Sequence, residues 1–149
     1  MGRSGPHPQG TPRSGDRTGR HEGRNPLENR SENRLELGRR GEEAAVRFLI
    51  GEGFRMIERG YRFSRGEIDV IAYDGPTLVF LEVKTRTDPD RGFPEEAVTW
   101  SKRRQIRRVA LGYLAEHPEL FDVPCRFDVI AVEFWGDARP MVRHFRNAF

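Results

Sequence analysis

Residues 65–86 read RGEIDVIAYDGPTLVFLEVKTR, and this stretch decides the fold. Two runs within it, Glu67–Tyr73 and Thr77–Thr85, are rich in the β-branched and apolar residues that favour strands. They are joined by Asp74-Gly75-Pro76, which has the composition of a tight turn. We therefore expect a β-hairpin at the centre of the domain.

The hairpin predicts which side chains face one another. If the turn is centred between Gly75 and Pro76, Asp69 lies opposite Glu82 and Glu67 lies opposite Lys84. Strand side chains alternate between faces, so these four polar side chains share one face. The opposite face is expected to be the core, and it carries Ile68, Val70, Ala72, Val79, Leu81 and Val83.

Two carboxylates directly opposite one another repel and destabilise a strand pair. A divalent cation such as Mg²⁺ would compensate, because hard ions bind carboxylate oxygens. Lys84 would add a positive charge beside Glu82, and lysine is rare here: of 26 basic residues, only Lys84 and Lys102 are lysine. The simpler interpretation is an exposed ladder in which Glu67 pairs with Lys84 and Asp69 faces solvent.

Composition limits the class of protein. The 149 residues suffice for one domain and a tail. Cys125 is the only cysteine, which excludes an intrachain disulfide and a cysteine-cluster zinc site and fits a reducing compartment. No apolar run reaches the ~18 residues of a membrane span, and the N-terminus lacks the apolar stretch of a secretory signal. We expect a cytoplasmic protein without membrane partners.

Residues 1–34 are rich in Gly, Pro, Ser, Asn and Arg, and we expect this tail to be disordered. It holds seven arginines and four acidic residues, so its net charge of +3 equals that of the whole chain, and residues 35–149 are neutral. A basic arm can raise nonspecific affinity for nucleic acid, and a plain solvated linker has the same composition.

The remaining pattern predicts two helices and further strands. The first helix is expected over Leu35–Gly51, with an apolar stripe on one side and Glu42 and Glu43 on a solvated face. The other expected elements are strands at Phe54–Glu58 and Tyr61–Phe63, a loop at Thr87–Pro94, a helix at Ser101–Glu116, and paired strands at Arg126–Phe134 and Met141–Phe145. This order predicts the α/β class, with a mixed central β-sheet flanked by helices.

The second predicted helix is locally basic. Its first half carries Arg103, Arg104, Arg107 and Arg108 and no acidic residue, which suits either a phosphate-tracking surface or a solvated helix face. Its buried stripe is expected to be Ile106, Val109, Ala110, Tyr113 and Leu114, with Lys102 on the same side. Cys125, His117 and His144 have no partners at ligand spacing and are interpreted as structural or exposed. The chain also lacks a glycine-rich phosphate loop and a zinc motif.

Asp69, a spacer, and Glu82-Val83-Lys84 resemble the D…E-x-K signature of the PD-(D/E)XK, or restriction endonuclease-like, superfamily. The wider context resembles the YraN family of small bacterial proteins, predicted nucleases similar to archaeal Holliday junction resolvases. That context comprises Gly41-Glu42, GEIDVIA, LVFLEVKTR, the helix opening with Lys102, and RFDVIAV, and it covers residues 35–149. Ile68 stands where the superfamily name has proline.

The resemblance implies a restriction endonuclease-like domain over residues 35–149 and an Mg²⁺- or Mn²⁺-dependent endonuclease acting on DNA, including branched or structured DNA, as a homodimer. It implies that Asp69, Glu82 and Glu42 bind the metal, with the backbone carbonyl of Val83 as a further ligand. It also implies that Lys84 orients or deprotonates the water that attacks the phosphodiester. By analogy, this replaces the solvated interpretation of Glu42. Glu67 and Gln105 are second-tier site residues, and the expected nucleic-acid contacts are Arg86, Lys102, Arg103 and Gln105.

Two functions of different class remain open. The first is the metal-dependent nuclease, which the complete set Asp69, Glu82 and Lys84 favours. The second is a nucleic-acid-binding or interaction module that keeps the fold without turnover.

Overall fold

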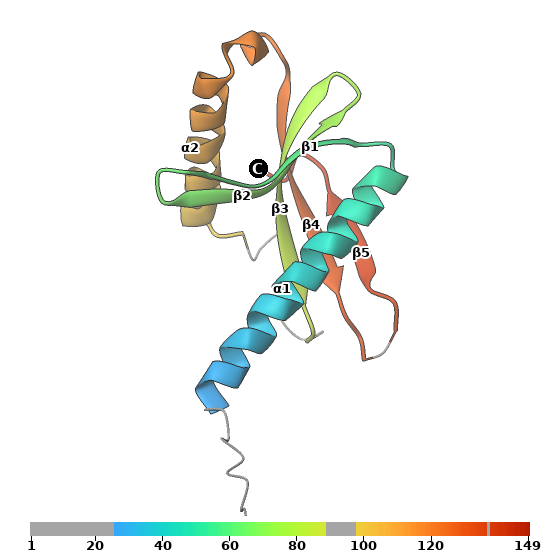
Figure 1. The fold of residues 1–149 in the computed structure, drawn as a ribbon. Helices are drawn as coiled ribbons and strands as arrows, with labels where there is room; N and C mark the ends of the chain where they lie inside the picture. The colour runs from blue at the N-terminus through green and yellow to red at the C-terminus, as the bar shows by residue number, and fades with distance from the viewer. Residues whose placement is uncertain (1–25, 89–97, 137) are drawn as a thin grey trace, which may run out of the picture.

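A computed structural model describes residues 26–88, 98–136 and 138–149. Within them a mixed sheet has the strand order β1-β2-β3-β4-β5 (Figure 1). The strands are β1 (Arg55–Phe63), β2 (Gly66–Asp74), β3 (Thr77–Arg86), β4 (Cys125–Glu133) and β5 (Met141–Phe145). Only β3 and β4 pair in parallel, and the other neighbours are antiparallel. The predicted α/β class is confirmed.

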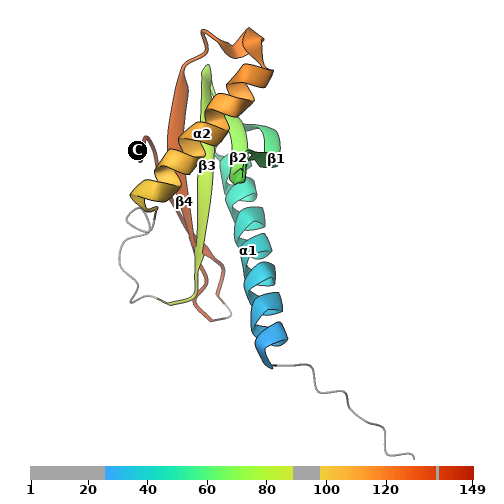
Figure 2. The same cartoon turned by 90° about the vertical axis from the view of Figure 1, so that its left-hand side faces the viewer.

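The two long helices cover opposite faces of the sheet (Figure 2). Helix α1 (Pro26–Gly51) precedes the sheet, and α2 (Trp100–Glu116) connects the parallel pair β3 and β4. The short 3-10 helix η2 (Pro118–Leu120) follows α2. No helix among these residues is long and apolar enough to cross a bilayer.

The predicted hairpin is confirmed. Strands β2 and β3 are joined at Gly75 and Pro76, and Gly75 has a φ of +57°, which glycine adopts without strain. Asp74 pairs with Thr77 and Val70 pairs with Leu81, which is the predicted register.

The prediction that only one face of the hairpin is core is wrong, because α1 and α2 bury both faces. Val70, Ala72, Val79 and Leu81 pack under α1, with Val83 partly buried beside them. Ile71, Leu78 and Phe80 are fully buried under α2. Ile68 was expected on the face that α1 covers. It packs instead with the residues under α2, at the end of β2 that no longer pairs with β3. Strands enclosed on both sides are apolar on both sides.

Helix α1 begins nine residues earlier than predicted. Residues 26–34 are helical, so the predicted disorder is wrong for them, and residues 1–25 lie outside the described part. Pro26 occupies the first helical position, where its fixed φ is favourable, and residues 27–37 contain neither glycine nor proline. The side chains of residues 27–36 are exposed, so this first part of α1 does not contribute to the core.

The other predicted elements are found with small changes. The two expected strand pieces before the hairpin form one strand, β1, with a bulge between Met56 and Glu58. Helix α2 begins one residue early and is capped by the Thr99 hydroxyl, which accepts from the amide of Lys102. Strands β4 and β5 pair as expected. The predicted loop after Arg86 lies largely outside the described residues.

Candidate active site

Helix α1 approaches β3 closely at one glycine. A side-chain carbon at Gly41 would collide with the hydroxyl of Thr85 on β3, so only glycine permits this contact. The next residue, Glu42, is therefore held beside the end of β3 that carries Glu82 and Lys84. The local sequence Gly41-Glu42 thus fixes how near an acid on α1 comes to the sheet.

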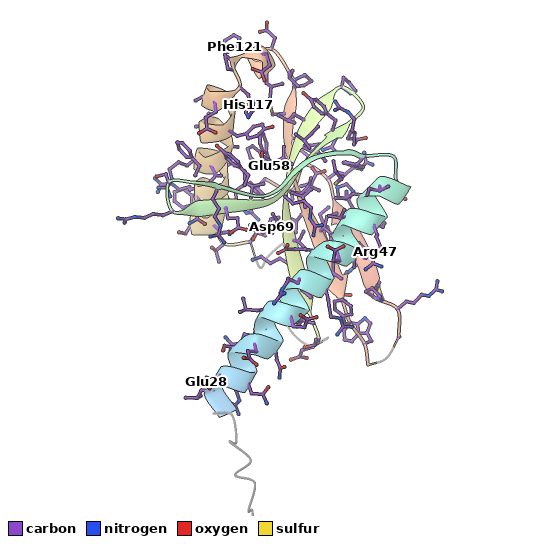
Figure 3. The ribbon with its side chains drawn as sticks, viewed as in Figure 1. Glu28, Arg47, Glu58, Asp69, His117 and Phe121 are labelled. Atoms are coloured by element: carbon purple, nitrogen blue, oxygen red, sulfur yellow. The ribbon has the colours of Figure 1, made fainter. Side chains whose placement is uncertain are left out.

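Strands β2 and β3 separate where the predicted acids begin. Their ladder ends at Val70 and Leu81, and the carboxylate of Asp69 accepts a hydrogen bond from the amide of Val83 at 2.7 Å. The side chain of Asp69 thus satisfies an amide that a ladder partner would otherwise satisfy. Asp69 lies between α1 and α2 in Figure 3.

The predicted pairing of Glu67 with Lys84 is wrong for the same reason. The residues of β2 that precede Val70 pair only with β1 and not with β3. The carboxylate of Glu67 therefore accepts from Arg62 of β1 at 2.9 Å. Asp69 and Glu82 are likewise not ladder partners, although both line one depression of about 360 Å³. The other residues lining it are Arg34, Leu37, Gly38, Glu42, Val83, Lys84 and Thr85.

Both lysines of the chain meet at Glu82. The Glu82 carboxylate is 4% exposed, and its Oε1 lies 3.1 Å from Lys84 Nζ and 3.4 Å from Lys102 Nζ. Its Oε2 is buried and has no hydrogen-bond partner. A buried carboxylate oxygen without a donor is costly, so the site has unfilled capacity for a positive group.

The surroundings oppose ionisation of the neighbouring acid. Burial, reinforced by the charge of Glu82, raises the pKa of Asp69 from its ordinary value of 3.8 to about 7, against the lowering effect of the Val83 amide. Burial is also the largest cause that raises the pKa of Glu42, and Glu82 adds to it. Three acids therefore repel one another around one depression, which favours a bound cation.

The donor set fits a divalent ion held chiefly by two carboxylates. The described residues contain no group of three or more His, Cys, Asp or Glu side chains arranged to hold a metal. Asp69, Glu82 and Glu42 line the depression and could supply oxygen donors, and one oxygen of Glu82, Oε2, has no hydrogen-bond partner. Mg²⁺ tolerates few protein ligands because it keeps several waters. Binding by Glu42 stays a prediction.

The residues predicted to contact nucleic acid have different surroundings. Lys102 contacts Glu82, and Gln105 donates to the carbonyl of Arg65 at 3.1 Å. Arg103 donates to the carbonyl of Val98, and its guanidinium lies 5.5 Å from the ring centre of Phe149. Arg86 lines a neighbouring depression at the end of β3. Lys102 is thus nearest to the candidate chemistry, and Arg103 is engaged within the protein.

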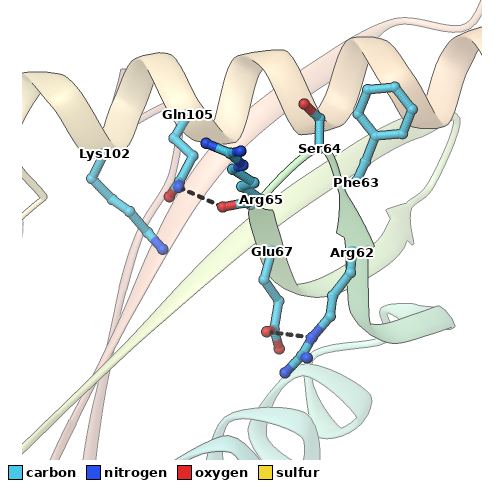
Figure 4. Close-up of a pocket in the computed structure, with 8 residues that line it drawn as sticks. Arg62, Phe63, Ser64, Arg65, Glu67, Lys102 and Gln105 are labelled. Atoms are coloured by element: carbon cyan, nitrogen blue, oxygen red, sulfur yellow. Dashed lines mark hydrogen bonds and ion pairs between the residues drawn. The ribbon is translucent and has the colours of Figure 1, made fainter.

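Sequence reasoning missed two basic residues beside these sites. Arg34 lines the depression with Asp69, but the sequence interpretation assigned it to the tail. The available signal is that no glycine or proline occurs from Leu27 to Leu37. Arg65, in the β1–β2 turn, lines the adjoining pocket in Figure 4, and no sequence pattern places that turn against α2.

His144 is structural, as expected. Its Nε2 lies 2.8 Å from Asp128, which is fully buried and also accepts from Arg126 and the amide of Asn147. These hydrogen bonds lower the pKa of Asp128 despite its burial. The cluster ties β5 and the C-terminus to β4 and lies outside the depression that holds Asp69.

Comparisons with known proteins identify one family model and relatives that carry the same family name. Residues 41–132 match the family model described as "Uncharacterised protein family UPF0102". A UPF0102 protein of Chlorobium phaeobacteroides is 47% identical over 119 residues, which cover 76% of this chain and 94% of that protein. A UPF0102 protein of Symbiobacterium thermophilum is 50% identical over 117 residues, covering 76% and 95%. The matched region contains Glu42 and the residues of the D…E-x-K signature.

Proposed function

This chain belongs to the uncharacterised protein family UPF0102, and we propose that it is a metal-dependent endonuclease that hydrolyses phosphodiester bonds in DNA, including branched or structured DNA. One observation carries the proposal. Asp69, Glu82 and Lys84 line a single depression, and one oxygen of the Glu82 carboxylate is buried without a hydrogen-bond partner. The resemblance to the PD-(D/E)XK superfamily supports the same assignment.

The acids would hold the ion. Asp69 and Glu82 supply the carboxylate oxygens, Glu42 is the third candidate, and the carbonyl of Val83 is the further ligand that the resemblance implies. When bound, Mg²⁺ or Mn²⁺ would polarise the scissile phosphate and acidify a bound water. Asp69 must be ionised to act as a ligand, so its raised pKa makes metal binding favour neutral and alkaline pH.

In this proposal, Lys84 acts on the attacking water and the phosphate. Its ammonium lies 3.1 Å from Glu82, and its side chain is 30% exposed, so it reaches both the acid and the open depression. From there it can donate to an attacking water and stabilise negative charge on the phosphoryl oxygens. Lys102 contacts the same oxygen of Glu82 from α2 and limits where that carboxylate can point.

A binding module without turnover is the second candidate. Lys84 and Lys102 already offset the charge of Glu82 without a metal, and such an internal ion network can be purely structural. Without a metal, this ion network leaves Oε2 of Glu82 without a partner and the pKa of Asp69 raised, which favours the nuclease.

Cleavage of labelled linear, flapped and four-way DNA in Mg²⁺ or Mn²⁺ tests the proposal. The wild-type chain is expected to cleave at least one of these substrates, and Asp69→Ala and Lys84→Ala should each lose about 10²–10⁴-fold in rate. The matched control is Glu52→Ala, an exposed acid at the end of α1. Equal residual cleavage by both site variants would identify a contaminant. DNA binding that survives EDTA, without cleavage in any metal, would establish the module.

A further inference from the structure

We propose that the groove between the β1–β2 turn and α2 binds the sugar-phosphate backbone of DNA beside the cleaved bond. We call it the turn groove, and it has a volume of about 510 Å³. The residues lining it include Arg62, Arg65, Gly66, Glu67, Lys102 and Gln105 (Figure 4). The inference rests on the proposed function, since it names the surface that holds the substrate.

The turn has an unusual backbone. Ser64 and Arg65 have φ values of 43° and 63°, in the left-handed region that residues other than glycine rarely adopt. Two-residue hairpin turns of this kind normally carry Asn or Gly. A strained conformation persists only when its surroundings hold it, and such positions cluster at ligand-binding sites.

Helix α2 supplies those surroundings. Gln105 donates to the carbonyl of Arg65, and Arg108 donates to the carbonyl of Ser64 at 3.4 Å. A side-chain carbon at Gly66 would lie 2.5 Å from Val109 of α2, so the turn rests directly on the helix. Because the backbone carbonyl of Arg65 makes the contact, its guanidinium is not needed for docking.

The groove is positively charged. Its only acid, Glu67, is paired with Arg62, and Lys102 is shared with Glu82 outside the lining. Arg65 is therefore the cation of the lining that faces no acid within the groove. A second depression continues along α2 and shares Lys102 and Gln105 with the turn groove. Its lining contains no acid and comprises Thr99, Ser101, Lys102, Arg104, Gln105 and Arg108. Cations and hydroxyls along one track are the groups that contact phosphates.

Helix α2 divides its arginines between two tasks. The guanidiniums of Arg103 and Arg107 each lie 5.5 Å from the ring centre of Phe149, so they cover the C-terminus. Arg104 and Arg108 line the second depression, where Arg104 also lies over the ring of Trp100 and Arg108 also donates to the carbonyl of Ser64. The basic first half of the helix is therefore partly structural and partly available to a polyanion.

Lys102 joins this track to the candidate active site. Its side chain lines both depressions on α2, while its Nζ lies 3.4 Å from Glu82 Oε1. A strand whose phosphate occupied the Asp69 depression would continue past Lys102 toward Arg65. The placement thus predicts contacts on one side of the cleaved bond.

Salt-dependent DNA binding tests the groove separately from cleavage. The full chain carrying Asp69→Ala is titrated in EDTA against fluorescent duplex and four-way DNA between about 50 and 300 mM salt. In this background, Arg65→Ala and Arg104→Ala should each weaken binding about three- to tenfold and lower the slope of log K against log salt by about 1. Arg47→Ala, an exposed arginine on α1, is the matched control and should change neither.

The outcomes separate the two proposals. If Arg65→Ala in the turn groove and Arg104→Ala in the second depression both match the Arg47 control while the wild type cleaves DNA, the proposed phosphate track is wrong and the nuclease stands. If both lose affinity and slope although no metal supports cleavage, the groove stands and the nuclease fails. Absence of DNA binding and of cleavage in the wild type would overturn both.

Discussion

Asp69→Asn should stabilise the metal-free protein at neutral and alkaline pH. Burial and the nearby Glu82 carboxylate raise the pKa of Asp69 to about 7, so ionisation of Asp69 opposes folding. Asparagine removes that charge and keeps an oxygen that can accept from the Val83 amide, as Asp69 does at 2.7 Å. The substitution therefore isolates the electrostatic cost of placing two acids together.

The size and sign of the effect come from the pKa. A group with a raised pKa in the folded state costs nothing below its unfolded pKa of 3.8, and the cost grows as pH rises toward about 7. At 1.36 kcal/mol for each pKa unit the full difference is about 4 kcal/mol, and partial exposure to solvent reduces it to about 2–4 kcal/mol. The variant should match the wild type near pH 4 and exceed it by that amount at pH 8.

Urea denaturation in EDTA at several pH values measures the difference. Asp122→Asn, on an exposed turn, is the control and should track the wild type at every pH. Mg²⁺ should stabilise the wild type more than Asp69→Asn, because a ligand that binds only the folded state adds to its stability. A stability difference that does not vary between pH 4 and pH 8 would refute the reasoning.

Three further predictions concern packing, the buried ion cluster and the second lysine. Gly41→Ala should lower the free energy of unfolding by about 1–3 kcal/mol in thermal or urea denaturation, because the added carbon meets β3. Gly38→Ala, with open space around it, should be neutral or stabilising, and equal effects of the two changes would contradict the close contact. Asp128→Ala should lower the free energy of unfolding by about 3–5 kcal/mol, because the loss of this carboxylate leaves buried donors unpaired. The control Asp122→Ala, at an exposed position, should lower it by less than about 0.5 kcal/mol, and a similarly small loss for Asp128→Ala would show that the cluster is dispensable. Lys102→Met should move the acid limb of the cleavage–pH profile upward at subsaturating Mg²⁺, because the lysine charge lowers the pKa of Asp69, and an unchanged limb would refute that coupling.

The central hairpin could be predicted because its determinants are local. The turn at Gly75 and Pro76 sets the register of the ladder that runs from Val70 and Leu81 to Asp74 and Thr77. The first residues of β2, which precede Val70, are positioned by tertiary contacts instead. The β1–β2 turn rests on α2 through Gly66 and Gln105, and this packing draws β2 away from β3. No pattern within the hairpin encodes that departure.

The candidate acids were found by residue type and resemblance, but their contacts were not. Asp69 was expected to face Glu82 across a ladder, and it instead accepts from the amide of Val83. The scarcity of lysine indicates a specific role for each lysine, and the prediction used it for Lys84 alone. Lys102, 18 positions away in the sequence, meets the same oxygen of Glu82 because the crossover helix brings it over the sheet.

Mn²⁺ binding at pH 8, measured by calorimetry or paramagnetic resonance, tests most directly whether Asp69 and Glu82 share an ion. The wild type is expected to bind at least one ion, and Asp69→Asn and Glu82→Gln should each lose about 10- to 100-fold in affinity or more. Glu52→Gln, at an exposed acid in the turn after α1, should bind as the wild type does. Equal affinity in all four proteins, or no binding by the wild type, would contradict the account.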